Sequence, residues 1–203
     1  EVERLFWESW AASAAGEIGH ADLRNLIRLM ADPLPADPPA RGDLLAWLHP
    51  RASAVARIAL TMAQRQELDT LAPAERLACG FVLTRLLVDL PRHAAAGRNY
   101  FPLSDLQRAG LSRQELLEGV RTQAVHAFLV QECAWAEELL AQGLPVCEGV
   151  GARLRRGLRA AVLRARLLLD QVADPRRDVF RHPPRLSAAA RYRAALEARG
   201  ASL

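Results

Sequence analysis

LTRLLVDLPRHAAAGRNYFP, residues 83–102, runs from an apolar helical segment into a polar turn. The apolar residues before Asp89 are typical of a helix, whereas Pro91 removes a backbone donor and predicts that the helix ends or kinks there. Asp89 and His93 are four residues apart, a spacing that places two side chains on one face only where a helix continues. The segment therefore predicts a helix end that carries one acid, one histidine and several arginines.

This segment resembles the second aspartate-rich motif of the squalene and phytoene synthases. In that motif an Asn precedes a DxxxD pair, and a Gly-Arg-x-Tyr-Leu-Pro sequence follows. When the two are aligned without gaps on the Gly-Arg step at 97–98, the family's Asn falls on Arg85, its first Asp on Asp89 and its second Asp on His93. The alignment therefore leaves one of the three oxygen ligands in place.

The resemblance covers most of the chain from about Gly42 onward. Tyr100–Leu106 and Ala109–Ser112 look like the family's connection into its next helix, and Arg164–Val172 is similar to its late helix. The resemblance implies an all-α fold, a single-domain bundle of the isoprenoid synthase type with about eight helices around a central cavity. We expect residues 1–203 to form this one domain, with the helices of the family's first metal motif missing.

The resemblance also implies a chemistry that depends on metal ions. Magnesium held by carboxylate oxygens draws negative charge onto a diphosphate leaving group. Asp89 and His93 are the candidate metal ligands in this chain, but imidazole is a poor ligand for magnesium, which prefers oxygen. We therefore expect no cofactor, unless the chain is catalytic, in which case it would need magnesium.

Arginine side chains offer another way to hold a phosphate group. A guanidinium binds phosphate oxygens in pairs without any metal ion. Arg85, Arg92 and Arg98 are candidates for this role, and the resemblance adds Tyr100 as a fourth diphosphate-binding residue. The alternative is that these arginines are ordinary solvated side chains, as surface charges usually are.

Composition limits the classes of partner and compartment. All 27 basic residues are arginine, but the net charge is only +4 and the basic residues alternate with acidic ones, which argues against a nucleic-acid-binding surface. Three cysteines, widely separated and odd in number, argue against a disulfide framework. No apolar run reaches the length of a membrane span. We therefore expect a cytoplasmic protein with at most peripheral contact with the inner membrane.

Apolar periodicity predicts a series of helices and no strands. The expected buried face of the helix at 119–142 consists of Val125, Phe128, Leu129, Cys133, Ala136 and Leu140. Pro73 fits the first position of a helix, and Ser112 with Glu115 matches a capping box. Further helices are expected at 2–15, 21–31, 43–66, 151–173 and 187–199.

Two classes of function follow from these observations. In the first, the chain is a pseudoenzyme that keeps the cavity and binds an isoprenoid diphosphate, a lipid-like ligand or a protein assembly partner. The family includes relatives of this kind. In the second, it is a magnesium-dependent prenyl transferase that joins two farnesyl or geranylgeranyl diphosphates head to head. The loss of the Asp at position 93 favours the first class, because fold alone does not determine function.

Overall fold

The computed structural model describes residues 20–63 and 68–200, in which every regular element is a helix. The helix expected at 2–15 lies outside these residues. The α-helices are α2 (His20–Ala31), α3 (Arg41–Met62), α4 (Leu68–Val88), α5 (Leu90–Ala95), α6 (Leu103–Arg108), α7 (Arg113–Leu117), α8 (Gln123–Gly143), α9 (Ala152–Ala173) and α10 (Ala188–Gly200), with a 3-10 helix η1 (Leu144–Cys147) after α8. The predicted all-α fold is confirmed.

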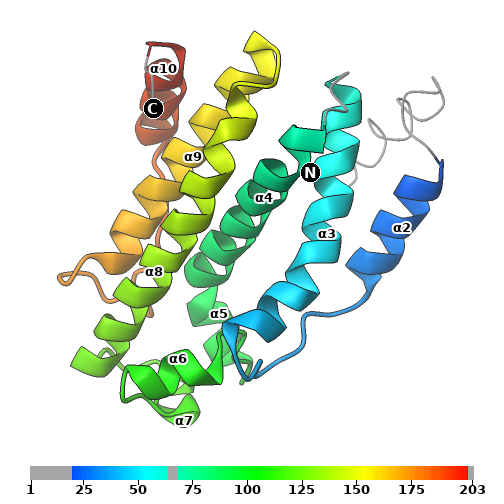
Figure 1. Ribbon diagram of the computed structural model, residues 1–203. Helices are drawn as coiled ribbons and strands as arrows, with labels where there is room; N and C mark the ends of the chain where they lie inside the picture. Colours follow the sequence, from blue (N-terminus) through cyan, green and yellow to red (C-terminus); the bar gives the residue numbers. More distant parts are fainter. Residues whose placement is uncertain (1–19, 64–67, 201–203) are drawn as a thin grey trace.

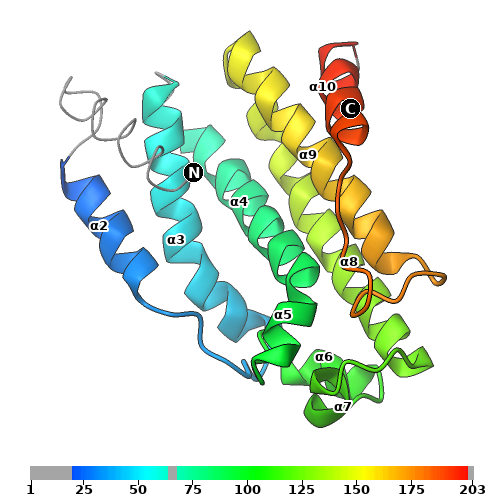
Figure 2. The same cartoon turned by 180° about the vertical axis from the view of Figure 1, so that it is seen from behind.

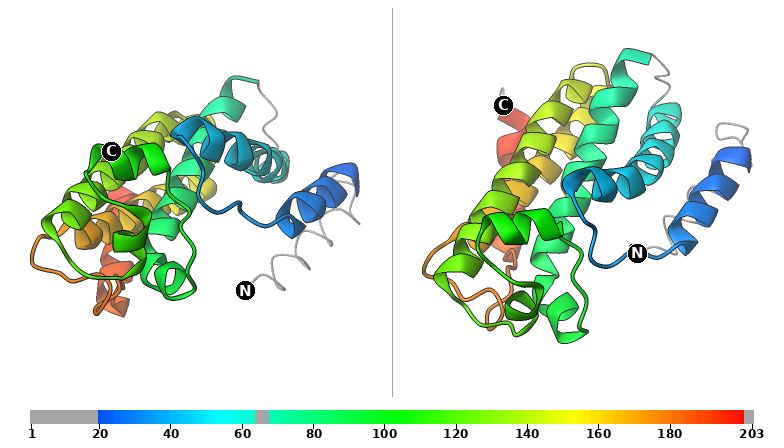
Figure 3. Two further views of the ribbon diagram at one scale, coloured as in Figure 1. Left: turned by 90° about the horizontal axis from the view of Figure 1, so that it is seen from below. Right: turned by 60° about the horizontal axis from the view of Figure 1, so that its bottom comes forward.

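The long helices form a bundle with α4 at its centre. Helix α4 packs against α8, α3 and α9, while α10 lies on α9 and α2 lies on the outer side of α3 (Figures 1 and 2). The short helices α5, α6 and α7 gather at one end of the bundle (Figure 3). None of the helices in the described ranges combines the length and apolar character of a bilayer-crossing segment.

The α4–α8 contact forms the middle of the core. Leu83 and Leu87 of α4 and Phe128 and Leu140 of α8 are fully buried. The face predicted for residues 119–142 is the buried face of α8, with all six of its expected members in the core. This helix begins at Gln123 rather than at residue 119, because Thr122 accepts a hydrogen bond from the Val125 amide and caps it.

Two other expectations about helix ends had different outcomes. The capping box of Ser112 and Glu115 is present at the start of α7. The prediction that Pro73 begins a helix is wrong, because α4 begins at Leu68 and Pro73 lies in its sixth position. An interior proline removes one backbone hydrogen bond. Core contacts of Leu71, Ala74 and Leu77, on the same segment, offset that loss.

Two glycines allow α4 and α8 to approach closely. A β-carbon on Gly143 would lie 2.5 Å from the backbone nitrogen of Leu77, and one on Gly80 would lie 2.9 Å from the backbone nitrogen of Leu140. Backbone atoms in two packed helices cannot move aside as the end of a flexible side chain can. Both positions therefore require glycine for the observed spacing of the helices.

We predict that Gly143→Ala lowers the free energy of unfolding by about 1–3 kcal/mol, since overpacking forces the two helices apart. Urea denaturation followed by circular dichroism measures this change. Gly157→Ala is the matched control, because Gly157 is an exposed residue inside α9 with no atom within 4 Å of an added β-carbon. The control should gain about 0.5–1 kcal/mol from helix propensity. Equal stability of Gly143→Ala and the wild type would contradict the packing argument.

Candidate functional site at the α4–α5 break

Asp89 lies between α4 and α5, where Pro91 interrupts the helix. The Asp89 amide donates to the Arg85 carbonyl and closes α4, and its own carbonyl accepts from the His93 amide in the first turn of α5. Pro91 occupies the first turn of α5, where its missing donor is tolerated. The predicted interruption at Pro91 is confirmed, and it places Asp89 at a corner of the backbone.

The Asp89 carboxylate forms two ion pairs through one oxygen. Its Oδ2 lies 2.6 Å from Arg85 Nε and 3.2 Å from Arg92 Nη2. Two guanidiniums at this distance disfavour a divalent cation beside the same oxygen. Across residues 20–63 and 68–200, no group of three His, Cys, Asp or Glu side chains is placed to hold a metal ion. The described residues therefore do not fit a magnesium site.

His93 packs against an aromatic ring and offers no second acidic ligand. Its ring meets Tyr100 edge to face, with 4.8 Å between ring centroids. Burial lowers the pKa of His93, and the positive charge of Arg92 lowers it further. A lowered pKa favours the neutral imidazole at neutral pH. His93 therefore adds no negative charge to the surroundings of Asp89.

Arg98 and Tyr100 lie on the loop between α5 and α6, and hydrogen bonds hold this loop in place. The buried Asn99 side chain donates to the Phe101 carbonyl at 2.8 Å and accepts from the Phe101 amide at 2.9 Å. Arg98 is exposed, with Nη1 3.5 Å from the Tyr100 hydroxyl. The loop thus keeps Arg98 and Tyr100 beside His93. Their role in binding diphosphate stays a prediction.

Asp37, in the proline-rich connector before α3, forms hydrogen bonds that also hold this loop. Its amide donates to the Asn99 carbonyl at 2.8 Å, and its Oδ1 accepts from Arg113 Nε at 2.6 Å. Arg113 also donates to the Gly97 carbonyl. Contacts between the connector, the loop and α7 therefore fix the position of residues 97–101. None of these contacts could be found from local spacing in the sequence.

A hollow of about 290 Å³ lies between α4 and α9. Of the four predicted diphosphate-binding residues, Arg85 is the one that lines it. The complete lining comprises Phe81, Thr84, Arg85 and Val88 of α4 and Ala161, Arg164, Ala165 and Leu168 of α9. Its floor is apolar, and its two charged side chains are both arginines.

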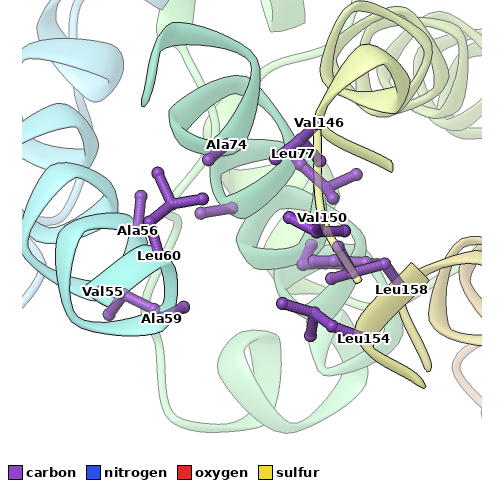
Figure 4. Close-up of a pocket in the computed structure, with 12 residues that line it drawn as sticks. Val55, Ala56, Ala59, Leu60, Ala74, Leu77, Val146, Val150, Leu154 and Leu158 are labelled. Carbon is purple, nitrogen blue, oxygen red and sulfur yellow. The ribbon is translucent and has the colours of Figure 1, made fainter. Parts of the chain in front are cut away.

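An apolar cavity of about 130 Å³ lies farther along α4. Figure 4 shows its labelled side chains, which converge from α3, α4, α9 and the segment around η1. The lining comprises Val55, Ala56, Ala59, Leu60, Ala74, Leu77, Ala78, Phe81, Val146, Val150, Leu154 and Leu158. Phe81 lines both this cavity and the arginine-lined hollow. An apolar space thus lies next to a cationic one, an arrangement suited to an amphiphilic anion.

A buried charged cluster lies near the start of α3 and was not predicted from the sequence. Arg41 donates through Nε to Asp105 Oδ2 at 2.6 Å and through Nη2 to Glu132 Oε1 at 3.1 Å. Both acids are fully buried, and the Arg41 guanidinium lies 4.4 Å from the centroid of the Trp135 ring. The cluster ties α3 to α6 and α8, and α6 directly follows the loop that carries Tyr100.

The two carboxyl groups of this cluster are too close for both to ionise easily. Burial and the negative charge of Asp105 together raise the pKa of Glu132 to about 8, although Arg41 opposes the shift. Oε2 of Glu132 receives no hydrogen bond from any described donor. This fits a protonated carboxyl group that donates toward Asp105 instead. Glu132 is therefore neutral below about pH 8 in the folded protein.

We predict that stability falls as the pH rises from about 5 to 8. The folded protein keeps the Glu132 proton up to about pH 8, whereas the unfolded chain loses it near 4.5, the ordinary pKa of a glutamate side chain. The stabilisation is therefore complete below pH 4.5 and is lost toward pH 8. Glu132→Gln should remove a slope of up to about 1.4 kcal/mol per pH unit. Urea denaturation at several pH values measures this slope.

Glu138→Gln is the matched control, because Glu138 lies exposed on the same helix and bonds to Gln142 at the surface. This control should keep the wild-type pH dependence. A Glu132→Gln protein with an unchanged slope between pH 5 and 8 would show that Glu132 is already ionised in the folded state.

The bundle, with its apolar cavity and adjoining hollow, has the all-α isoprenoid synthase fold. A dehydrosqualene synthase solved in complex with ligand superposes with a TM-score of 0.77 and 21% identity, over 88% of this chain and 63% of that one. The squalene synthase HpnC from Alicyclobacillus acidocaldarius gives a TM-score of 0.69 and 21% identity, over 77% and 60%. The predicted fold class is confirmed.

Sequence comparison identifies the family. The squalene/phytoene synthase family model matches residues 8–191, and the chain therefore belongs to the squalene/phytoene synthase family. The bifunctional protein CrtB/UppS of Streptomyces coelicolor is 36% identical over 87 residues, which are 43% of this chain and 15% of that protein. The chain spans less than two thirds of the length of each of these three relatives.

Proposed function

We propose that this protein is a non-catalytic member of its family that binds an isoprenoid diphosphate without a metal ion. The ion pairs of Asp89 with Arg85 and Arg92 carry the proposal, because both arginines occupy the carboxylate oxygen that would otherwise face a cation. In the ungapped alignment on residues 97–98, the family's second aspartate-rich motif falls at this position. Here it has the charge of an anion-binding site instead, with two guanidiniums around one carboxylate.

The hollow and the apolar cavity support an amphiphilic ligand. A diphosphate beside Arg85 would lie at the end of α4 that carries the polar break, while a prenyl chain would pass Phe81 toward Leu77 and Leu158. Arginine binds phosphate oxygens in pairs and is always charged. The apolar cavity would exclude water from the prenyl group of the ligand. This favours binding by about 25 cal/mol for each Å² of buried apolar surface.

Two other functions predict different results in the binding test described below. A magnesium-dependent head-to-head prenyl transferase would need carboxylates that the described residues do not bring together. A protein assembly partner would need an exposed apolar surface. Exposed tryptophans would suit such a surface, but Trp7 and Trp10 lie outside the described residues. Trp47 is half-buried, with the Arg51 guanidinium stacked 3.5 Å from its ring centroid.

We predict that the protein binds a non-hydrolysable farnesyl diphosphate analogue equally well with magnesium and with a chelator. Isothermal titration calorimetry under the two conditions makes the comparison. Fixed guanidinium charges do not depend on a dissociable ion, so the two affinities should agree within about twofold, less than 0.5 kcal/mol. Binding that the chelator abolishes would support the enzyme, and no binding in either condition would point to a protein partner.

Arg85→Ala should weaken binding of the analogue by roughly 10- to 100-fold, the loss expected for a hydrogen bond to a charged group. Arg24→Ala is the matched control, because Arg24 is an exposed arginine on α2, outside the residues that line either space. It removes the same charge and should change the affinity less than twofold, or 0.5 kcal/mol. An equal effect of the two substitutions would mean that only overall charge matters.

A further inference from the structure

Arg164 faces the arginine-lined hollow from the side opposite Arg85. It lies in the middle of α9, where Ala161, Ala165 and Leu168 line the same hollow. These positions recur every three or four residues and therefore share one face of the helix. Several other arginines are spread around α9, but Arg164 is the one among them that reaches this space.

The hydrogen bonds of Arg164 leave much of its guanidinium available. Its Nη2 donates to the Arg191 carbonyl at 3.4 Å, a long contact, and its Nε is buried without a hydrogen-bond partner among the described residues. No acid in the described ranges forms an ion pair with it. Arg51, by contrast, uses its guanidinium on the Trp47 carbonyl and on Asp32. A buried donor without an acceptor is unfavourable, and an anion in the hollow would satisfy it.

We propose that Arg164 binds the phosphate head of the ligand together with Arg85, so that α4 and α9 each contribute one guanidinium. This inference rests on the proposed function and extends it to the second wall of the site. Arg85 is paired with Asp89 through Nε, but no Asp or Glu lines the hollow itself, and no acid among the described residues pairs with Arg164. Phe81, which borders both the hollow and the apolar cavity, marks the point where the head group ends and the prenyl chain begins.

Two arginines on opposite walls make the head group a determinant of specificity. Guanidinium groups are planar and donate in pairs, so they distinguish a phosphate from an uncharged hydroxyl group. A prenyl alcohol would occupy the apolar cavity and leave Arg164 as it is without ligand. A prenyl diphosphate would add charged hydrogen bonds to the same apolar contacts. The contribution of Arg164 is therefore visible in the difference between the two ligands.

The test compares a farnesyl diphosphate analogue with farnesol, each titrated by calorimetry in the presence of a chelator. Arg164→Ala should weaken binding of the analogue at least tenfold and leave farnesol binding within twofold. Arg164→Lys keeps the charge without the planar donor pair and should give an intermediate loss for the analogue. Arg156→Ala, an exposed arginine on the same helix, is the matched control and should change neither affinity.

The outcomes separate a failure of this inference from a failure of the proposed function. If the wild type binds neither ligand, both proposals are overturned. If the wild type binds the analogue and Arg164→Ala binds it equally well, the role of Arg164 alone is overturned. An equal loss for farnesol and the analogue would show that Arg164 only supports the structure. Retained farnesol binding by Arg164→Ala also shows that this variant has kept the fold of the cavity.

Discussion

The close approach of α4 to α8 determines where everything else in the bundle lies. Gly80 and Gly143 bring the two backbones together, and a β-carbon at either position would meet backbone atoms of the other helix. With one side of α4 covered by α8, its remaining surface meets α3 and α9. The apolar cavity lies among these helices, and the arginine-lined hollow lies between α4 and α9. The location of both spaces therefore follows from the packing of two helices that meet over two glycines.

The polar end of the bundle has a different physical origin. Pro91 breaks the helix, the break places Asp89 at a corner, and Arg85 and Arg92 neutralise its charge there. At the same end, burial keeps Glu132 protonated beside Asp105. Both sites hold a carboxyl group with arginine, but one lies at the surface of the break and the other in the core.

Local signals in the sequence predicted the features that depend on neighbouring residues. The buried face of α8, the capping box of α7 and the break at Pro91 arise within a few residues of chain, and each is present. The prediction that Pro73 begins a helix was wrong, because core packing outweighs the local preference of proline for the first position of a helix. The contacts of Arg41 with Asp105 and Glu132 span 64 and 91 residues, so no spacing reveals them. Arg164 was also missed, because an even scatter of arginines does not show which one faces a cavity.

The shared oxygen of Asp89 has an evolutionary consequence. If an ancestor held metal at this position, replacing His93 with an acid would not by itself restore the site, because Arg85 and Arg92 would still occupy Oδ2 of Asp89. A substitution at position 85, 92 or 93 alone would leave at least one arginine beside the Asp89 carboxylate and would bring no catalytic gain. Selection therefore has no single-step path back to a metal-binding chain. Under the proposed function, the two arginines would make such a loss of the metal motif hard to reverse and would leave later substitutions free to refine binding.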